Sequence, residues 1–370
     1  MSRRRITPPK EDPPPGADAP YFPPFPASWL DHFQMWVERL RIPTWAFYVF
    51  AALGLSLLMH LLRWLDGSLP PGSLEVNQLT LGIFPVYFFA LIHYLNSAAR
   101  RALANYRPLL DLEEPDYASL EYTLTRIPRR IGLLAIAVGA FLSATSFFSS
   151  PESWGVEPSF PYLSRGALFI GAFFLQLAAT YWIFQVIRQA RTIDHIHQST
   201  NRLNIFRRDP VYAFSSLTLR SSLGLLLPVY TYLFLAYSLG VTATPSAVDA
   251  VAMGLTVALS LAIFFVPLSR MHGRLVDAKH RHLLDADHRY SLLVDRFNRQ
   301  VDKGNFDKGS FTDLDSNARV IAALAAQREA VTKISTWPWR PETLRSLLST
   351  VAAPIILYLA SRLVGRLFGV

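Results

Sequence analysis

Apolar residues fall into long runs that polar segments separate along the chain. Six runs cover residues 44–62, 79–95, 131–148, 167–186, 223–239 and 250–267, and a seventh lies within a helix expected over 341–368. Each run is close to the about 20 residues with which a helix crosses the hydrocarbon core of a bilayer. The pattern therefore predicts an all-α integral membrane protein with seven transmembrane helices.

The basic residues between these runs collect on one side of the expected membrane. With a cytoplasmic N-terminus, 32 of the 36 Lys and Arg residues lie in cytoplasmic segments. Those segments are 1–43, 96–130, 187–222 and 268–345. The outer loops 66–78 and 240–249 contain no basic residue. Because Lys and Arg stay on the cytoplasmic side of membrane proteins, the sequence predicts a cytoplasmic N-terminus and an external C-terminus.

The same asymmetry accounts for the formal net charge of +9. Basic residues beside every span face anionic lipid headgroups, whereas a nucleic-acid-binding protein gathers them on one folded face. We therefore expect the lipid bilayer as the main partner, no nucleic acid, and the plasma (inner cell) membrane as the location. The absence of cysteine excludes disulfides, thiolate catalysis and cysteine-ligated metals.

The N-terminal region divides into two parts. Residues 1–27 contain nine prolines and lack the apolar core of a signal sequence, which predicts a disordered cytoplasmic tail. Ser28 and Asp31 have the spacing of an N-terminal helix cap. They predict an amphipathic helix over 28–41 that lies in the membrane interface, with a partner-binding helix as the alternative.

The cytoplasmic segments look like continuations of membrane helices. The fourth span has no helix breaker after Val186, and Asp209 followed by Pro210 can begin the next helix, so 187–222 is expected to form a hairpin. Two amphipathic stretches in 268–335 predict a helical pair. Together they predict a cytoplasmic helical bundle, which is also a candidate surface for a protein partner.

A short aromatic segment connects this region to the last helix. Trp337, Pro338 and Trp339 precede Pro341, which suits the first turn of a helix. Tryptophan favours the membrane interface. The segment is interpreted either as a joint that transmits motion of the bundle to the last span or as a plain interfacial anchor.

Polar residues within the runs are almost all neutral. No Asp, Glu or Lys occurs in any run, which argues against a proton relay or a sodium-coupled carrier. The fourth and fifth runs contain several neutral polar side chains. The candidates for lining a ligand cavity are Gln176, Tyr181, Tyr230, Tyr232 and Tyr237. Hydrogen bonding between helices is the alternative role for these residues.

The sequence carries no signature of catalysis or of metal binding. It has no Gly-rich phosphate loop, HExxH motif or Gly-x-Ser-x-Gly motif. His280, His282 and His288 alternate with aspartates on one expected helix, and their spacing favours a solvated, salt-bridged face over a chelate. We therefore expect no enzymatic activity, no cofactor and no metal.

The last helix carries the residues for a comparison with a known family. It reads Ala-Pro-Ile-Ile-Leu-Tyr358-Leu-Ala-Ser361-Arg362, without the Thr-Tyr pair and the Gln that the family usually has there. In layout, however, residues 44–370 resemble the seven-transmembrane ion channels of the insect odorant and gustatory receptor class. The resemblance implies a homotetramer in which the last helix lines the pore, with Ser349, Thr350, Tyr358 and Ser361 as lining candidates.

Two functions follow from this reading. The first is a ligand-gated, cation-conducting channel or sensory receptor. The second is a non-conducting membrane sensor or scaffold that signals through its cytoplasmic helices. A small-molecule transporter is less favoured, because the spans lack carboxylates.

Overall fold

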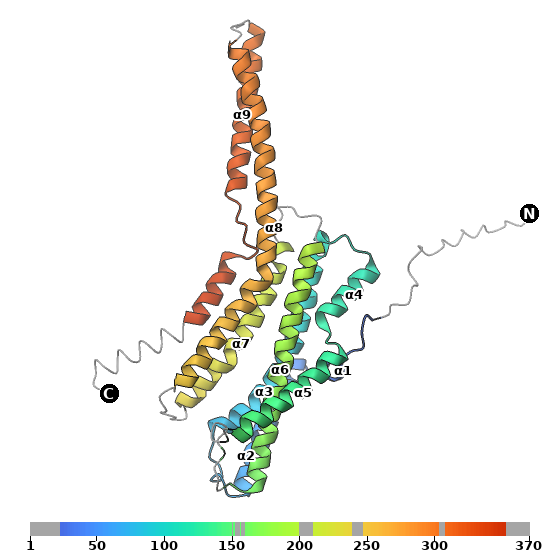
Figure 1. The fold of residues 1–370 in the computed structure, drawn as a ribbon, viewed down its shortest axis with the longest axis vertical. Helices are drawn as coiled ribbons and strands as arrows, with labels where there is room; N and C mark the ends of the chain where they lie inside the picture. The colour runs from blue at the N-terminus through green and yellow to red at the C-terminus, as the bar shows by residue number, and fades with distance from the viewer. Residues whose placement is uncertain are drawn as a thin grey trace, which may run out of the picture.

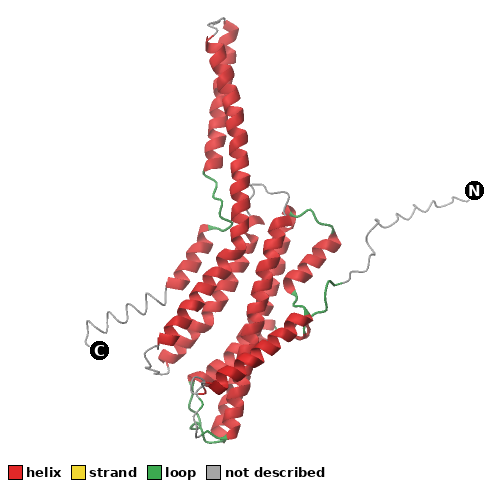
Figure 2. Ribbon diagram, viewed as in Figure 1, coloured by secondary structure: helices red, strands yellow, loops and turns green. Residues whose placement is uncertain are grey.

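The computed structural model describes residues 23–149, 151, 156, 160–199, 210–238, 247–302 and 308–352. Within these ranges the chain is helical and contains no strand (Figure 2). An isolated β-bridge joins Ala27 to Pro128. The expected all-α class is thus confirmed for the described part of the chain. The expected disordered tail, 1–27, lies almost entirely outside it.

The helices follow the apolar runs closely. They are α1 (Trp29–Glu38), α2 (Thr44–Leu65), α3 (Val76–Tyr106), α4 (Glu114–Thr125), α5 (Arg129–Ser149), α6 (Tyr162–Ser199), α7 (Ala213–Ser238), α8 (Ala247–Asp302) and α9 (Lys308–Thr332). Short 3-10 turns at Arg107–Leu109 and Pro210–Tyr212 follow α3 and precede α7. Residues 341–352 are also helical, and the description ends there.

Five described helices are long and apolar enough to cross a membrane. They are Thr44–Leu65, Val76–Leu109, Arg129–Ser149, Tyr162–Gln198 and Met253–Arg299. They contain the first four expected spans and most of the sixth, and by length and composition they indicate a membrane protein. The expected fifth span lies in α7, which is not among the five, and most of the seventh lies beyond the described residues. Seven spans and their orientation therefore stay predictions.

Helix α3 occupies the centre of the membrane bundle, where it packs against α2, α6 and α7 (Figure 1). Small residues allow the close crossings. A Cβ atom on Gly82 would lie 2.5 Å from Cα of Ser56, so α2 can approach α3 only because this position has no side chain. Gly224 of α7 approaches Leu91 of α3 in a similar way.

Helices α6 and α8 are longer than a membrane span requires. Helix α6 runs without a break to Ser199, as the lack of a breaker after Val186 predicts. Helix α8 has 56 residues, or about 84 Å of helix. Its second half pairs with α9 in a hairpin that projects away from the other helices (Figure 1). At the base of this hairpin, Arg270 forms an ion pair of 3.0 Å with Asp194 of α6.

Helix α1 begins at the predicted cap. The Ser28 hydroxyl accepts a hydrogen bond from the Asp31 backbone, and the Asp31 carboxylate accepts from Ser28 and from the Ile127 N–H at 3.1 Å. Burial raises the pKa of the Asp31 carboxyl, while these hydrogen bonds act to lower it. Trp29 and Trp36 on α1 are partly exposed, at 40% and 51%. The cap is confirmed, and the interfacial location stays a prediction.

Candidate ligand cavity and joint at the last helix

A cavity of about 510 Å³ lies between α3, α7 and the start of the last helix. Aromatic and aliphatic side chains form most of its wall, and Arg220 is the charged residue that lines it. The wall includes Tyr87, Tyr94, Leu227, Tyr230 and Thr350. The pocket is open on one side and its surface is almost entirely apolar, which suits a small apolar ligand.

The wall between α3 and α7 is held by hydrogen bonding and close packing. The Tyr87 hydroxyl donates to the Gly224 carbonyl at 2.8 Å. The guanidinium of Arg220 lies 5.6 Å from the ring centre of Tyr94, within the range of a cation–π contact. These contacts fix one side of the cavity independently of the last helix.

One hydrogen bond joins the cavity wall to the last helix. The Tyr230 hydroxyl of α7 donates to the Thr350 carbonyl at 2.7 Å. Both residues also line the cavity. Tyr230 is one of the expected cavity residues and Thr350 one of the expected pore residues, so the structure brings together two candidates that the sequence places 120 positions apart.

The other pore candidates are placed differently. The Ser349 hydroxyl is exposed and donates to the carbonyl of Ser346 at 3.0 Å, and the Thr350 hydroxyl donates to the same carbonyl at 2.8 Å. Their hydroxyl groups therefore bond back to their own helix. Tyr358 and Ser361 lie outside the described residues.

The remaining cavity candidates whose side chains the structure describes do not line this cavity. Tyr181 is fully buried on α6, where its ring packs edge to face with Trp29 at 5.5 Å. Gln176 is half-buried on the same helix, and Tyr232 is 43% exposed on α7. The side chain of Tyr237 lies outside the described residues. The five tyrosine and glutamine candidates therefore do not line one common cavity.

The expected joint packs directly on α8. The Trp337 ring stacks on His272 at 3.7 Å with an angle of 9° between the planes, and on Trp339 at 4.4 Å. Trp339 also contacts the rings of Phe264 and Phe265. Pro338, which separates the two tryptophans in the sequence, is also buried.

Hydrogen bonds hold the segment before the joint. The ring Nδ1 of His272 donates to the Thr336 carbonyl at 3.0 Å. Lys279 donates to the carbonyls of Thr332 and Ile334, at 2.7 and 2.9 Å, just after α9 ends. The chain from α9 to the last helix is thus attached to α8 where the hairpin leaves the bundle.

A buried polar cluster between α1, α3 and α6 has no counterpart among the predictions from the sequence. The side-chain amide of Asn96 on α3 donates to Gln34 at 3.1 Å, and Gln185 and Gln189 donate to the Asn96 oxygen at 2.6 and 3.3 Å. The cluster ties α1 and α6 to α3. Glutamines four positions apart on one helix are a visible signal, but their shared partner lies far away in the sequence.

The histidines near the ends of spans are bound within the protein. His93 lies 3.1 Å from the Tyr48 hydroxyl and 3.0 Å from Glu38, and His60 accepts from the Glu75 backbone at 3.3 Å. They therefore make contacts between helices and loops of the bundle. No group of three His, Asp or Glu side chains gathers as a metal site within the part of the chain that the structure describes.

Comparison with known proteins assigns no family or function to these sites. No protein-family model, curated protein or solved structure matches the chain.

Proposed function

We propose that the protein is a ligand-gated, cation-conducting channel or sensory receptor in which a small apolar ligand occupies the cavity beside the last helix. The observation that carries this proposal is the hydrogen bond from Tyr230 to the Thr350 carbonyl. A ligand in the cavity touches both residues. It can therefore change the position of the last helix relative to α7 and α3.

The proposal includes the arrangement expected from the sequence. Seven spans, a cytoplasmic N-terminus and a homotetramer in the plasma membrane place the last helix beside a shared axis. The exposed Ser349 supports this, because its side chain faces away from the helices of its own chain. Closed rings of identical subunits are the usual way in which one helix per chain lines a pore.

The joint supplies the route between the cytoplasmic hairpin and the last helix. The stacked rings of His272, Trp337 and Trp339 form a rigid contact just before residue 341, where that helix begins. A change in the angle of α8 therefore moves the start of the last helix. This contact gives the hairpin a mechanical role in gating.

The first experiment counts subunits and measures conduction. The full chain is reconstituted in nanodiscs for mass photometry and in liposomes for cation flux. A tetramer with flux supports the channel. In Tyr230→Phe the ring stays but the hydrogen bond to Thr350 is lost. Because such a bond contributes about 1 kcal/mol, we expect basal flux to change about fivefold.

The matched control is Tyr232→Phe. Tyr232 is on the same helix, is exposed, and does not line the cavity. We expect its flux to equal that of the parent protein. Equal effects of the two substitutions would refute the role of the Tyr230 contact, and a monomer or dimer without flux would refute the channel.

The second candidate is a non-conducting sensor or scaffold that signals through the α8–α9 hairpin. The favouring observation is that this hairpin projects well beyond the membrane helices (Figure 1). Its exposed side chains are available to a cytoplasmic protein. This function is the one that a monomer or dimer without flux would support.

A further inference from the structure

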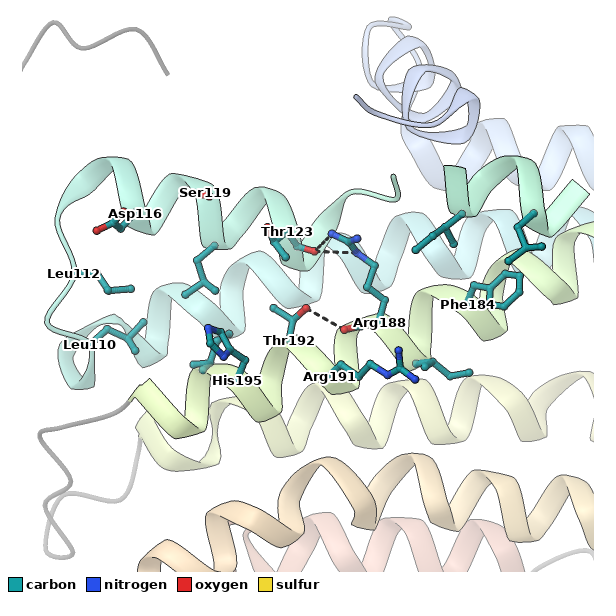
Figure 3. Close-up of a pocket in the computed structure, with 15 residues that line it drawn as sticks. Leu110, Leu112, Asp116, Ser119, Thr123, Phe184, Arg188, Arg191, Thr192 and His195 are labelled. Carbon is teal, nitrogen blue, oxygen red and sulfur yellow. Dashed lines mark hydrogen bonds between the residues drawn. The ribbon is translucent and has the colours of Figure 1, made fainter. Parts of the chain in front are cut away.

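A second, larger cavity lies far from the last helix, between α4, the start of α5 and the continuation of α6. It is an open groove of about 810 Å³ (Figure 3). One part of the groove is apolar and includes Leu120, Ile131, Leu134 and Phe184. The middle of the groove carries Arg188 and Arg191, and the far end holds His195 together with Leu110 and Leu112, so the basic groups lie between two apolar patches (Figure 3).

The change from apolar to basic follows one face of α6. Phe184, Ile187, Arg188, Arg191 and His195 recur at the three- and four-residue spacing that places side chains on one side of a helix. Eleven positions of helix span about 16 Å. This length matches a lipid headgroup together with the first part of its acyl chains.

Arg188 is held in place by the protein. Its guanidinium donates two hydrogen bonds to the Thr123 carbonyl, at 3.1 and 2.5 Å, and lies 4.5 Å from the ring centre of Phe25 (Figure 3). These contacts leave its positive charge without a carboxylate in hydrogen-bonding contact. The charge of Asp31 acts on this guanidinium without a hydrogen bond, and an anion in the groove would add a direct contact.

Arg191 is exposed one turn further along α6 and forms no ion pair with any residue that the structure describes. Asp194, the acidic residue nearest to it in the sequence, pairs with Arg270 instead. Asp116 is the acidic residue of the groove, and it lies at the end that contains Leu112 (Figure 3). Two arginines against one carboxylate leave the lining positive.

The apolar end of the groove opens on the lipid-facing surface. Leu134 of α5 is 52% exposed and Ile187 of α6 is 44% exposed, and both belong to helices that can cross a membrane. Arg129 and Arg130 at the start of α5 place this end of the bundle at a headgroup layer. The groove therefore runs from the hydrocarbon region into the layer where lipid phosphates lie.

We propose that this groove binds an anionic phospholipid. The phosphate contacts Arg188 and Arg191, and one acyl chain lies along Leu134, Phe184 and Ile187. Charge complementarity and continuity with the lipid-facing surface select this occupant. A free phosphate would leave the apolar part of the groove unfilled, and a zwitterionic lipid would bring a second positive charge next to the arginines.

The test uses the full chain in mild detergent with added phosphatidylglycerol or phosphatidylcholine of identical acyl chains, followed by native mass spectrometry. We expect the parent protein to retain phosphatidylglycerol preferentially. In Arg191→Gln we expect about fivefold weaker retention, the factor that follows from one basic residue near an anionic lipid. The exposed position of Arg191 keeps the fold intact.

Arg130→Gln is the matched control, because Arg130 is equally exposed at a similar depth but does not line the groove. Its retention of phosphatidylglycerol should stay within twofold of the parent. Equal retention of the two lipids, or equal losses in the two variants, would overturn the proposal. Displacement by glycerol phosphate at millimolar concentration would also overturn it, by identifying a soluble phosphate as the occupant.

Discussion

Helices α3 and α8 are both long and apolar enough to cross a membrane, but their surroundings differ greatly. In the most apolar 18-residue stretch of α3, 61% of the residues are buried, compared with 22% in α8. Helix α3 has neighbours on several sides, whereas the outer face of α8 presents large apolar side chains such as Leu255 and Val266. One helix is the core of the chain, and the other is part of its surface.

This difference gives the two helices different roles: α3 stabilises the fold, and α8 can transmit movement to the last helix. Burial of α3 supplies the apolar contacts that hold α2, α6 and α7 together. Lipid cannot replace any of these contacts without a loss of packing. Helix α8 is held mainly by α7, α9 and α6, and it carries the joint with the last helix. Its exposed face can therefore move against lipid, or meet a second copy, without disturbing the core.

The largest effect is expected when a side chain is added where α2 and α3 cross. In Gly82→Leu, the new Cβ would lie 2.5 Å from Cα and 2.6 Å from the backbone nitrogen of Ser56. Because backbone cannot move aside as a side chain can, we expect the loss of folded protein, seen as loss of the monodisperse peak in size-exclusion chromatography.

Gly54→Leu is the control for that substitution. Gly54 lies on α2, and a Cβ atom there meets nothing within 4 Å. We expect this variant to fold, with a thermal stability equal to or slightly above the parent, because glycine is a poor helix residue. A folded Gly82→Leu protein with parental stability would show that the two helices do not cross as described.

A pair of leucine substitutions measures the contrast directly. Leu95 of α3 is fully buried, and Leu255 of α8 is 66% exposed. We expect Leu95→Ala to lower the free energy of unfolding by about 2–4 kcal/mol, the usual cost of a cavity in a packed core. Leu255→Ala should change it by less than about 0.5 kcal/mol. Denaturant titration in mixed micelles gives both values.

An equal loss in the two leucine variants would contradict a purely lipid-facing role of Leu255. It would identify the outer face of α8 as a contact between subunits. The comparison between α3 and α8 would then describe the single chain but not the assembled protein.

Local patterns of the sequence predict much of this fold, because the hydrophobic effect and helix capping act over short distances. The apolar runs predict the helices, and Ser28 with Asp31 predicts the start of α1. The pairing of Tyr230 with Thr350 depends on how α7 meets the last helix, and periodicity alone carries no information about that contact. Likewise, nothing near Asn96 in the sequence indicates that three glutamines share its side chain.

The amphipathic groove was missed for a related reason. Arg188 and Arg191 look like ordinary basic residues at the end of a span, and the positive-inside pattern already explains their presence. Only the position of α4 across this face of α6 turns them into one side of a groove. A binding site between helices thus depends on tertiary packing, even where each helix is predicted correctly.

The smallest expected effect concerns the joint. Trp337→Ala removes the rings that stack between His272 and Trp339, and an aromatic pair of this kind contributes about 0.5–1.5 kcal/mol. We expect hydrogen exchange in residues 333–340 to become about 2- to 10-fold faster, because local opening reports local stability. Trp45→Ala, at a highly exposed position on α2, should leave that exchange unchanged.

Because Trp337 is itself partly exposed, the melting temperature of the Trp337→Ala protein should stay near that of the parent. A fall as large as that of Leu95→Ala would show that the joint belongs to the core, and α8 would then be no more independent of the bundle than α3.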